Sequence, residues 1–527
     1  MRRLILLACL AGPLAAQRFY VDDPLDKEPP PLSVGEILSR KLSDYYDLFS
    51  NQFGDVGERQ PRSGTPIAAQ GVNTLGEPMD GGWYQKRHYY RRMSREELMR
   101  GPGSENPPST TGQWTIVAAK SEGVTPGFAI VDSEKRFYYV KFDPPSNPEM
   151  ATAADSIGAR FFYALGYHVP ENYIVHFKAG QLQLGPGVQV EDATGRKRAM
   201  TNSDVTRLLA KVSVGPDGQY RATASRSVPG KPIGPPRYHG TRTDDPNDIV
   251  PHEHLRALRG LQVFCAWLDH DDSRAINNLD TVVTEDGVSY VRHYLLDFGS
   301  ALGSATNRAN SPRSGDYFFT WKSSAVQLLT LGAKPPYWAF ARYPDHPSVG
   351  LFESKVFDPE KWVPEYPNPA FNNRLPDDDF WAAKQVMAFS DSDIDAVVST
   401  GRLSDPKAAA YLAQCLRERR NKIGMAYFAK VLPFDRFRIQ SGRLDWDDLS
   451  KQHGFGVVGN VHIQWSRFDN ETGTRTPLPD AKGETVPQAA GYLAAELSAP
   501  SRPRQTVVVY LRQNGGGTSV VGVDRTW

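Results

Sequence analysis

The sequence predicts an α+β protein with a two-lobed core, an N-terminal extension and a C-terminal β-sandwich-like domain. Apolar residues alternate with period two from Trp114 to Phe142, which indicates antiparallel strands. Helical spacing dominates from about residue 252 to 430, and alternation returns after Pro433. The chain has 527 residues, which is longer than a domain with a single hydrophobic core usually is. Its composition, 40% hydrophobic and 23% charged, is that of a folded globular protein.

The charge balance excludes one class of partner. Lys and Arg together number 61 and Asp and Glu 60, which leaves a net charge of +1. A nucleic-acid-binding protein usually carries a basic field that attracts phosphates, and this chain has none overall. We therefore expect no nucleic-acid partner, and specificity must come from a local site.

The first sixteen residues have the features of a signal peptide. Arg2 and Arg3 precede an apolar run at residues 4–11, and small residues at 14–16 follow a helix-breaking Gly-Pro pair. We predict a signal peptide at 1–16 and an exported protein, periplasmic or extracellular. Lipoprotein anchoring is the less favoured reading because Cys9 comes very early in the segment.

Residues 17–111 form a loop-rich N-terminal arm. It contains one amphipathic helix candidate at 34–53 and a capping box from Ser94 to Glu97. Six basic residues between Lys86 and Arg95 alternate with tyrosines, and we interpret them as a solvated face.

The predicted core occupies residues 112–432. Its N-lobe, 112–178, reads as three strands, a helix from Pro148 to Gly166 and a fourth strand. Residues 179–251 are polar and rich in Gly and Pro, and we interpret them as an insertion and linker. The C-lobe, 252–432, begins with an apolar helix and a hairpin, and the C-terminal β domain follows at 433–527. The strands expected in the N-lobe are Trp114–Ala119, Phe128–Asp132, Phe137–Phe142 and Val169–Phe177.

Two short motifs in the predicted C-lobe carry the chemistry. His270-Asp271-Asp272-Ser273-Arg274-Ala275-Ile276-Asn277 precedes a hairpin that ends in Leu295-Leu296-Asp297-Phe298-Gly299. Phosphoryl transfer needs an Asp near the attacking hydroxyl, and an Asn and a second Asp to hold Mg²⁺. Asp272, Asn277 and Asp297 have the required residue types, and Arg274 can neutralise the transferring phosphate.

This pattern resembles the catalytic loop and the Asp-Phe-Gly motif of the protein-kinase-like superfamily, as an atypical member. In that family a strand lysine before a helix pairs with an acid on the helix, and here Lys141 stands in Tyr139-Val140-Lys141-Phe142. The resemblance implies that ATP and Mg²⁺ are bound. It assigns Lys141 to the α- and β-phosphates, Asp155 to the pair with Lys141, Asp272 to the catalytic base beside Arg274, and Asn277 and Asp297 to the metal.

The chain departs from the family pattern in two places. In place of a G-x-G-x-x-G loop it has only Gly123 and Gly127, which we expect to approach the phosphates. The helix acid is an Asp where Glu is usual, and Glu149 is a second candidate for the pair with Lys141. We favour a role for Glu149 at the helix N-terminus.

Two functions follow. The first is an ATP- and Mg²⁺-dependent phosphotransferase acting on a hydroxyl acceptor of a protein, sugar or lipid headgroup. The alternative is a catalytically inactive kinase-like scaffold that holds a partner, such as a glycan or peptide, in its cleft or on its C-terminal β domain. A metal site of another kind is not indicated, because His252 and His254, at i and i+2, do not share a helix face.

Overall fold

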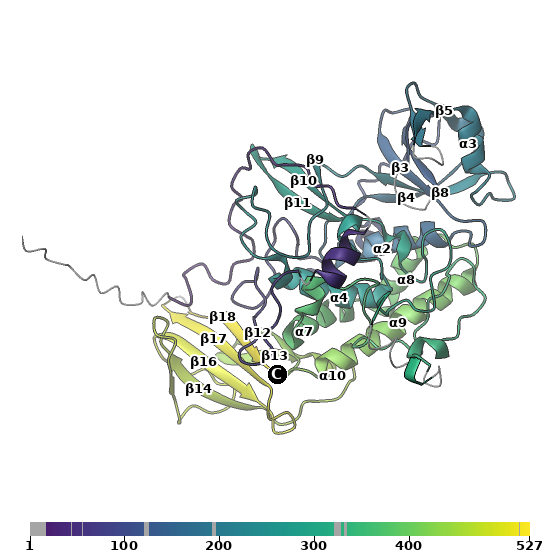
Figure 1. Ribbon diagram of the computed structural model, residues 1–527. Coiled ribbons are helices and arrows are strands. Elements are labelled where there is room, and N and C mark those ends of the chain that lie inside the picture. Colours follow the sequence, from purple (N-terminus) through teal and green to yellow (C-terminus); the bar gives the residue numbers. More distant parts are fainter. Residues whose placement is uncertain are drawn as a thin grey trace, which may run out of the picture. The chain divides into compact units, whose positions relative to one another are not determined.

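The computed structural model describes residues 17–43, 45–54, 56–120, 126–191, 196–320, 328–330, 335–515 and 517–527. These residues form two compact units (Figure 1). Unit 1 consists of residues 17–26, Val72–Glu77 and Phe428–Trp527, and unit 2 of Lys27–Gly71 and Pro78–Tyr427. The predicted signal peptide lies outside the described residues.

Unit 2 contains a six-stranded sheet in the order β4-β8-β3-β2-β1-β5. Its neighbours pair antiparallel except β1 and β5, which are parallel. The strands are β1 (Trp114–Ala119), β2 (Gly127–Val131), β3 (Phe137–Phe142), β4 (Asn172–Phe177), β5 (Leu182–Leu184) and β8 (Tyr220–Arg226), and a separate pair is β6 (Gln189–Glu191) with β7 (Lys197–Ala199). The four strands expected in the N-lobe are thus present.

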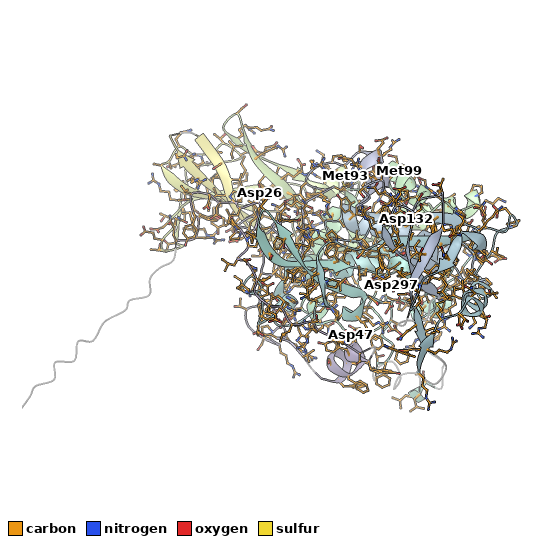
Figure 2. All side chains as sticks on the ribbon, turned by 90° about the horizontal axis from the view of Figure 1, so that it is seen from above. Asp26, Asp47, Met93, Met99, Asp132 and Asp297 are labelled. Atoms are coloured by element: carbon orange, nitrogen blue, oxygen red, sulfur yellow. The ribbon has the colours of Figure 1, made fainter. Side chains whose placement is uncertain are left out.

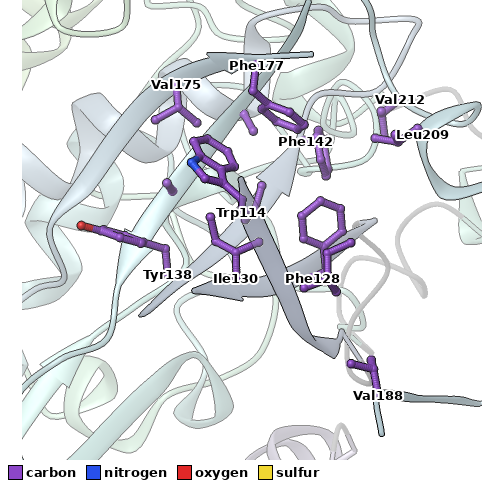
Figure 3. Close-up of a cluster of buried hydrophobic side chains, with 14 of the residues drawn as sticks. Trp114, Phe128, Ile130, Tyr138, Phe142, Val175, Phe177, Val188, Leu209 and Val212 are labelled. Atoms are coloured by element: carbon purple, nitrogen blue, oxygen red, sulfur yellow. The ribbon is translucent and has the colours of Figure 1, made fainter. Parts of the chain in front are cut away.

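The segment 179–251 differs from its prediction as an insertion and linker, because β8 lies inside the sheet between β3 and β4. Helix α3 (Asn202–Leu209) adds Leu209 to the hydrophobic core of this sheet. Figure 3 shows that core, in which the largest side chains are aromatic. They are Trp114, Phe128, Tyr138, Phe142 and Phe177.

Helix α2 (Met150–Ala164) follows β3 and is almost wholly buried. It begins two residues later than predicted because Glu149 adopts a left-handed conformation, with φ of 68°. Gly158 allows the helix to approach Phe298, since a Cβ added at this glycine would lie 2.8 Å from the Phe298 Cβ. The rings of Phe162 and Phe298 stack with centroids 4.9 Å apart. This contact joins α2 to the turn after Asp297.

Most other helices of unit 2 lie between residues 252 and 428, as predicted for the C-lobe. The described helices are α1 (Arg95–Arg100), α4 (Arg256–Leu268), α6 (Pro369–Asn372), α7 (Pro376–Met387), α8 (Asp391–Ser399) and α9 (Pro406–Phe428). Single helical turns are η2 (Ala179–Gln181), η3 (His252–His254), η4 (Ala275–Asn277), η5 (Phe298–Ser300) and η6 (Tyr337–Phe340), and a three-stranded sheet comprises β9 (Lys231–Gly234), β10 (Asn278–Glu285) and β11 (Val288–Leu295). Helix α4 is entirely buried, and its Trp267 Nε1 donates to the Leu416 carbonyl of α9 at 2.9 Å.

The arm contains less helix than predicted. Among the described residues of the expected helix at 34–53, the helical element that forms is η1 (Asp47–Phe53), a π-helical turn. The first part of that range runs along the three-stranded sheet, because Val34 N donates to Ser289 O and Arg40 N to Ile233 O, each at 2.8 Å. Pairing with the sheet therefore overrides helical spacing there. The capping box from Ser94 to Glu97 is confirmed at the start of α1.

Unit 1 is a strand-rich body with apolar packing on both faces of an antiparallel sheet. Phe19 covers one face beside Phe468 and Tyr510, and a hairpin packs on the other through Phe434 and Leu444. The sheet has the order β15 (Arg475–Pro477), β14 (His462–Phe468), β16 (Gly491–Ser498), β17 (Thr506–Asn514) and β18 (Gly517–Thr526), and the hairpin is β12 (Phe434–Gln440) with β13 (Arg443–Asp448), followed by α10 (Leu449–Gln452). The predicted α+β class is thereby confirmed.

No helix in the described ranges is both long and apolar enough to span a membrane. Cys265 and Cys415 are buried free thiols.

Candidate active site

The site is organised around an ion pair between a strand lysine and the aspartate of the Asp-Phe-Gly motif. Lys141 lies on β3 directly opposite Gly127 of β2, and its Nζ donates to Asp297 Oδ1 at 2.7 Å. Asp297 follows β11 and has φ of 58°, a left-handed conformation that Asp tolerates better than most residues. Both side chains are partly buried, at 21% and 32% exposure, so the pair stays within reach of a ligand. Figure 2 labels Asp297 in unit 2.

Asp155 lies near this pair but does not take the partner role that the resemblance implies. Its side chain on α2 is 2% exposed, and its Oδ1 accepts from Asn172 Nδ2 at 3.0 Å. Asp297, not Asp155, accepts the hydrogen bond of Lys141. Glu149 stands at the N-cap of α2 and does not bond to Lys141. Its Oε2 accepts from the Ser404 backbone N–H at 2.8 Å. The hydrogen-bonded partner of Lys141 is therefore Asp297, while Asp155 acts on the Lys141 ammonium through its charge.

The charge of Asp155 is nevertheless coupled to the pair. Burial raises the pKa of Asp155 to about 6, Lys141 acts in the opposite direction, and the nearby Asp297 raises it further. Its Oδ2 is buried without a hydrogen-bond partner among the described residues. Asp155 is thus a buried carboxylate whose ionisation the fold disfavours.

We expect Asp155→Asn to stabilise the ligand-free protein above pH 6. Because the folded-state pKa lies above the ordinary value of 3.8, the folded protein binds more protons than the unfolded chain between about pH 4 and 6. Wild-type stability therefore falls over this window by up to about 3 kcal/mol from this group, and the Asn variant lacks that loss. Melting temperatures from pH 4 to 8 should be similar at the acid end and higher for the variant at pH 8. An equal or lower melting temperature at pH 8 would contradict the assignment.

The predicted catalytic loop, residues 270–277, lies beside the same turn. Asp272 forms an ion pair with Arg274, and Asn277 Nδ2 donates to the Asp272 carbonyl at 2.8 Å. The backbone N–H of Leu296 donates to Asn277 O at 3.0 Å, which brings the loop next to Asp297. Burial raises the pKa of Asp272, Arg274 opposes that shift, and the charge of Asp297 adds to it. The two sequence motifs thus meet at one place.

His270 connects the start of this loop to the turn that follows Asp297. Its Nδ1 lies 3.3 Å from the Ser300 carbonyl, and its ring lies 5.9 Å from that of Phe298. Burial lowers the pKa of His270, so the imidazole is neutral at pH 7. The residue therefore positions the loop and adds no charge to the site.

Of the two glycines expected to approach the phosphates, the structure describes Gly127. Gly123 lies outside the described residues. Gly127 is the first residue of β2, and a Cβ there would lie 2.5 Å from the Val140 carbonyl oxygen. Its structural requirement is close strand pairing beside Lys141, rather than the loop conformation expected from the resemblance.

Sequence reasoning missed two charged residues at the site. Lys120, directly after β1, interacts electrostatically with Lys141, Asp297 and Asp155, and burial and the Lys141 charge lower its pKa. A lysine ending a strand opposite Gly127 is the signal that could have identified it. Burial raises the pKa of Asp47 in η1 to about 6, and the nearby Arg274 charge and Ala275 backbone N–H act in the opposite direction. No motif marks Asp47, because it comes from the arm (Figure 2).

The side chains present fit a hard divalent cation held jointly with phosphate oxygens. Asp297 offers carboxylate oxygens, and the Nδ2 hydrogen bond of Asn277 to the Asp272 carbonyl leaves the Asn277 Oδ1 available as an acceptor. The described residues contain no group of three or more His, Cys, Asp and Glu that could hold a metal ion alone. A magnesium site that depends on substrate phosphates matches this sparse donor set.

Solved kinase structures resemble this chain at low identity. The crystal structure of the Helicobacter pylori proinflammatory kinase CtkA is 12% identical with a TM-score of 0.32, and the match covers 60% of this chain and 98% of that one. Golgi casein kinase with Mn/ADP bound is 10% identical with a TM-score of 0.28, over 60% of this chain and 75% of that one. A further structure of Golgi casein kinase is 12% identical with a TM-score of 0.30, over 77% and 96%. No family model and no curated protein matches the chain.

Proposed function

We propose that the protein is a phosphotransferase that moves the γ-phosphoryl group of ATP to a hydroxyl acceptor, with Mg²⁺ as cofactor. The observation that carries the proposal is the meeting of two motifs 20 residues apart in the chain. The Lys141–Asp297 pair lies at one side, and the loop of Asp272 and Asn277 is joined to it through the 3.0 Å bond from Leu296 N. This arrangement supplies both kinds of group that phosphoryl transfer needs.

In the proposed reaction the acceptor oxygen bonds to the γ-phosphorus while the bond from that phosphorus to the bridging oxygen breaks, which releases ADP. Asp272 receives the hydroxyl proton, and burial, which raises the pKa of this carboxylate above its usual value, makes it a stronger proton acceptor than an exposed aspartate. Lys141 and Lys120 would neutralise the phosphate oxygens, and Arg274 orients Asp272 through their ion pair. Mg²⁺, held by Asn277 and Asp297, would supply charge neutralisation of the phosphates.

The alternative function, an inactive scaffold, does not require the charged side chains of the site to lie together. Holding Lys141, Lys120, Asp155 and Asp297 together requires burying charge, which costs free energy unless a ligand or partner compensates it. A scaffold that binds only through unit 1, to a glycan or peptide, needs none of that. The clustered charges therefore favour the enzyme.

Binding of Mg²⁺-ATP tests the proposal. We expect Mg²⁺-ATP to raise the melting temperature of the full chain, and ATP with EDTA to raise it much less. Lys141→Met should remove most of the response, because it deletes the phosphate-binding ammonium. Lys135→Met makes the same substitution at an exposed turn between β2 and β3 and should respond like the wild type. No response in the wild type, or equal responses in both variants, would contradict the proposal.

We also propose that the protein is exported after removal of residues 1–16. The support is the basic start, the apolar run and the small residues before Gln17. Mass spectrometry of the protein isolated from its host's periplasm or medium should give an N-terminus near Gln17. An intact Met1 on exported protein would contradict cleavage, and protein confined to the cytoplasm would contradict export.

A further inference from the structure

A cavity of about 470 Å³ lies in unit 2, apart from the candidate active site. Its walls come from α2, β4, the turn after α8 and the segment that follows α1. None of Lys141, Asp272, Asn277 and Asp297 lines it. The volume lies in the range that holds a small organic ligand.

Two arginines line this cavity without a carboxylate partner among the described residues. Arg160 on α2 donates to neutral oxygens only, among them Ser156 O and Oγ at 2.9 Å each and the carbonyls of Met99 and Asn172. Arg402, after α8, donates to the Ile174 carbonyl at 3.4 Å and is otherwise exposed. The two positive guanidinium groups at this cavity repel each other unless an anion lies between them.

The nearby acids are engaged elsewhere. Glu171 binds the Tyr173 hydroxyl and accepts from Ser104 N at 3.1 Å and from Arg226 at 3.3 Å. Glu149 accepts from the Ser404 N–H and lies 3.7 Å from Arg221. The cavity therefore keeps a positive charge that the protein itself does not cancel.

Burial and nearby positive charges lower the pKa values of two side chains at the cavity, Arg160 and His176. Burial and then the charge of Arg402 lower the pKa of Arg160 to about 10, and Tyr173 opposes this shift. Burial lowers the pKa of His176, and the charges of Arg221 and Arg402 lower it further. Asp217 and Glu149 oppose this shift of His176 without reversing it.

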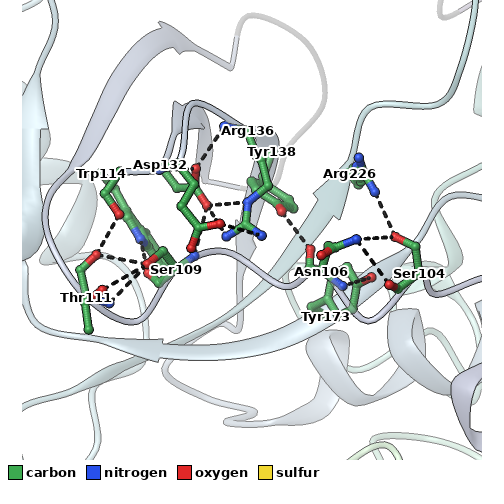
Figure 4. Close-up of polar contacts among 12 residues, drawn as sticks. Ser104, Asn106, Ser109, Thr111, Trp114, Asp132, Arg136, Tyr138, Tyr173 and Arg226 are labelled. Carbon is green, nitrogen blue, oxygen red and sulfur yellow. Dashed lines mark hydrogen bonds and ion pairs between the residues drawn. The ribbon is translucent and has the colours of Figure 1, made fainter.

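The segment before β1, which forms one wall of the cavity through Pro107, Pro108 and Thr110, is fixed by hydrogen bonds to the sheet. Figure 4 shows the segment before β1, where Asn106 O accepts from the Tyr138 hydroxyl at 2.7 Å and Ser109 N donates to Asp132 Oδ2 at 2.9 Å. Trp114 Nε1 donates to Ser109 O at 2.8 Å. Between these anchors Pro107 and Pro108 present apolar surface to the cavity. A preformed wall lowers the entropic cost of binding.

We propose that this cavity binds a small phosphate monoester with an apolar body. The two guanidinium groups match the charge and the several acceptor oxygens of a phosphate dianion. The prolines, Met99 and Trp114 match an apolar substituent. This site goes beyond the proposed phosphotransferase and does not depend on it.

Calorimetric titration of the full chain with phenyl phosphate tests the inference. We expect phenyl phosphate to bind, phenol not to bind, and inorganic phosphate to bind more weakly because it lacks the apolar body. Arg402→Gln should weaken phenyl phosphate binding about tenfold or more, since a charge-assisted hydrogen bond is lost. The side chain of Arg402 makes one long bond, so this variant should fold normally. Arg160→Lys keeps the charge but loses the forked donor geometry and should also bind more weakly.

The matched control is Arg438→Gln, which removes the same charge from the β12–β13 hairpin of unit 1 and should bind like the wild type. Saturating Mg²⁺-ATP should leave the phenyl phosphate affinity within about twofold, because the cavity is not the candidate active site. Absent binding, equal affinities in Arg402→Gln and Arg438→Gln, or displacement by Mg²⁺-ATP would each overturn the inference. If Mg²⁺-ATP fails to bind while the Arg402 effect persists, the proposed function fails and this inference stands.

Discussion

Asp272→Asn should lower turnover by about 10² to 10⁴ while leaving the affinity for Mg²⁺-ATP within a few fold, because loss of a positioned proton acceptor has an effect of that size. The substitution keeps the side-chain volume and removes the carboxylate that would receive the hydroxyl proton. Water can serve as the acceptor in a first assay, with release of ADP as the readout. Melting with Mg²⁺-ATP measures binding separately.

The control for this variant is Asp286→Asn, in the exposed turn of the β10–β11 hairpin that follows the catalytic loop. Asp286 has a left-handed φ of 51°, which Asn also adopts readily, so the control should keep both turnover and stability. Wild-type turnover that survives in Asp272→Asn would show that another group takes the proton. Equal losses in Asp272→Asn and Asp286→Asn would point to a general loss of folded protein.

The elements that the sequence predicted well are those whose pattern is local. The alternation from Trp114 to Phe142 and the helical spacing before Gly166 each reflect one buried face, so the strands and α2 follow from them. The spacing of Asp272, Asn277 and Asp297 was informative because a hairpin lies between the motifs. Pairing of Asn278 with Leu295 across that hairpin returns the chain to its starting point.

The features that the sequence did not predict depend on contacts between distant segments. Strand β8 carries small residues, Ala222 to Ser225, whose hydrophobic contrast is low, and its place in the sheet follows from its pairing with β3 and β4. Asp47 reaches the catalytic loop from an arm with no motif. Lys141 donates its hydrogen bond to Asp297, while Asp155 accepts from Asn172. No local pattern encodes such choices.

Asp297→Asn should weaken the affinity for Mg²⁺-ATP at least about tenfold, because it removes the charged oxygen donor of the proposed metal site. The stabilisation by Mg²⁺-ATP should therefore largely vanish, while any weak response to ATP with EDTA should remain. This variant separates the metal site from Lys141, whose ammonium it leaves in place.

The ligand-free stability of the same variant distinguishes a metal ligand from a residue needed only by the fold. Burial opposes ionisation of Asp297, but Lys141 and then Lys120 outweigh it, so its pKa lies below the ordinary value of 3.8. The charged carboxylate thus stabilises the fold above pH 4, and that contribution is lost as the pH falls through the lowered pKa. Relief of repulsion with Asp155 and Asp272 offsets part of the lost ion pair in the variant.

We expect a small drop in melting temperature at pH 7 that shrinks below pH 4. A large drop at every pH, with the Mg²⁺-ATP response intact in the folded fraction, would assign Asp297 to the turn after β11 and remove the metal site from the proposed mechanism.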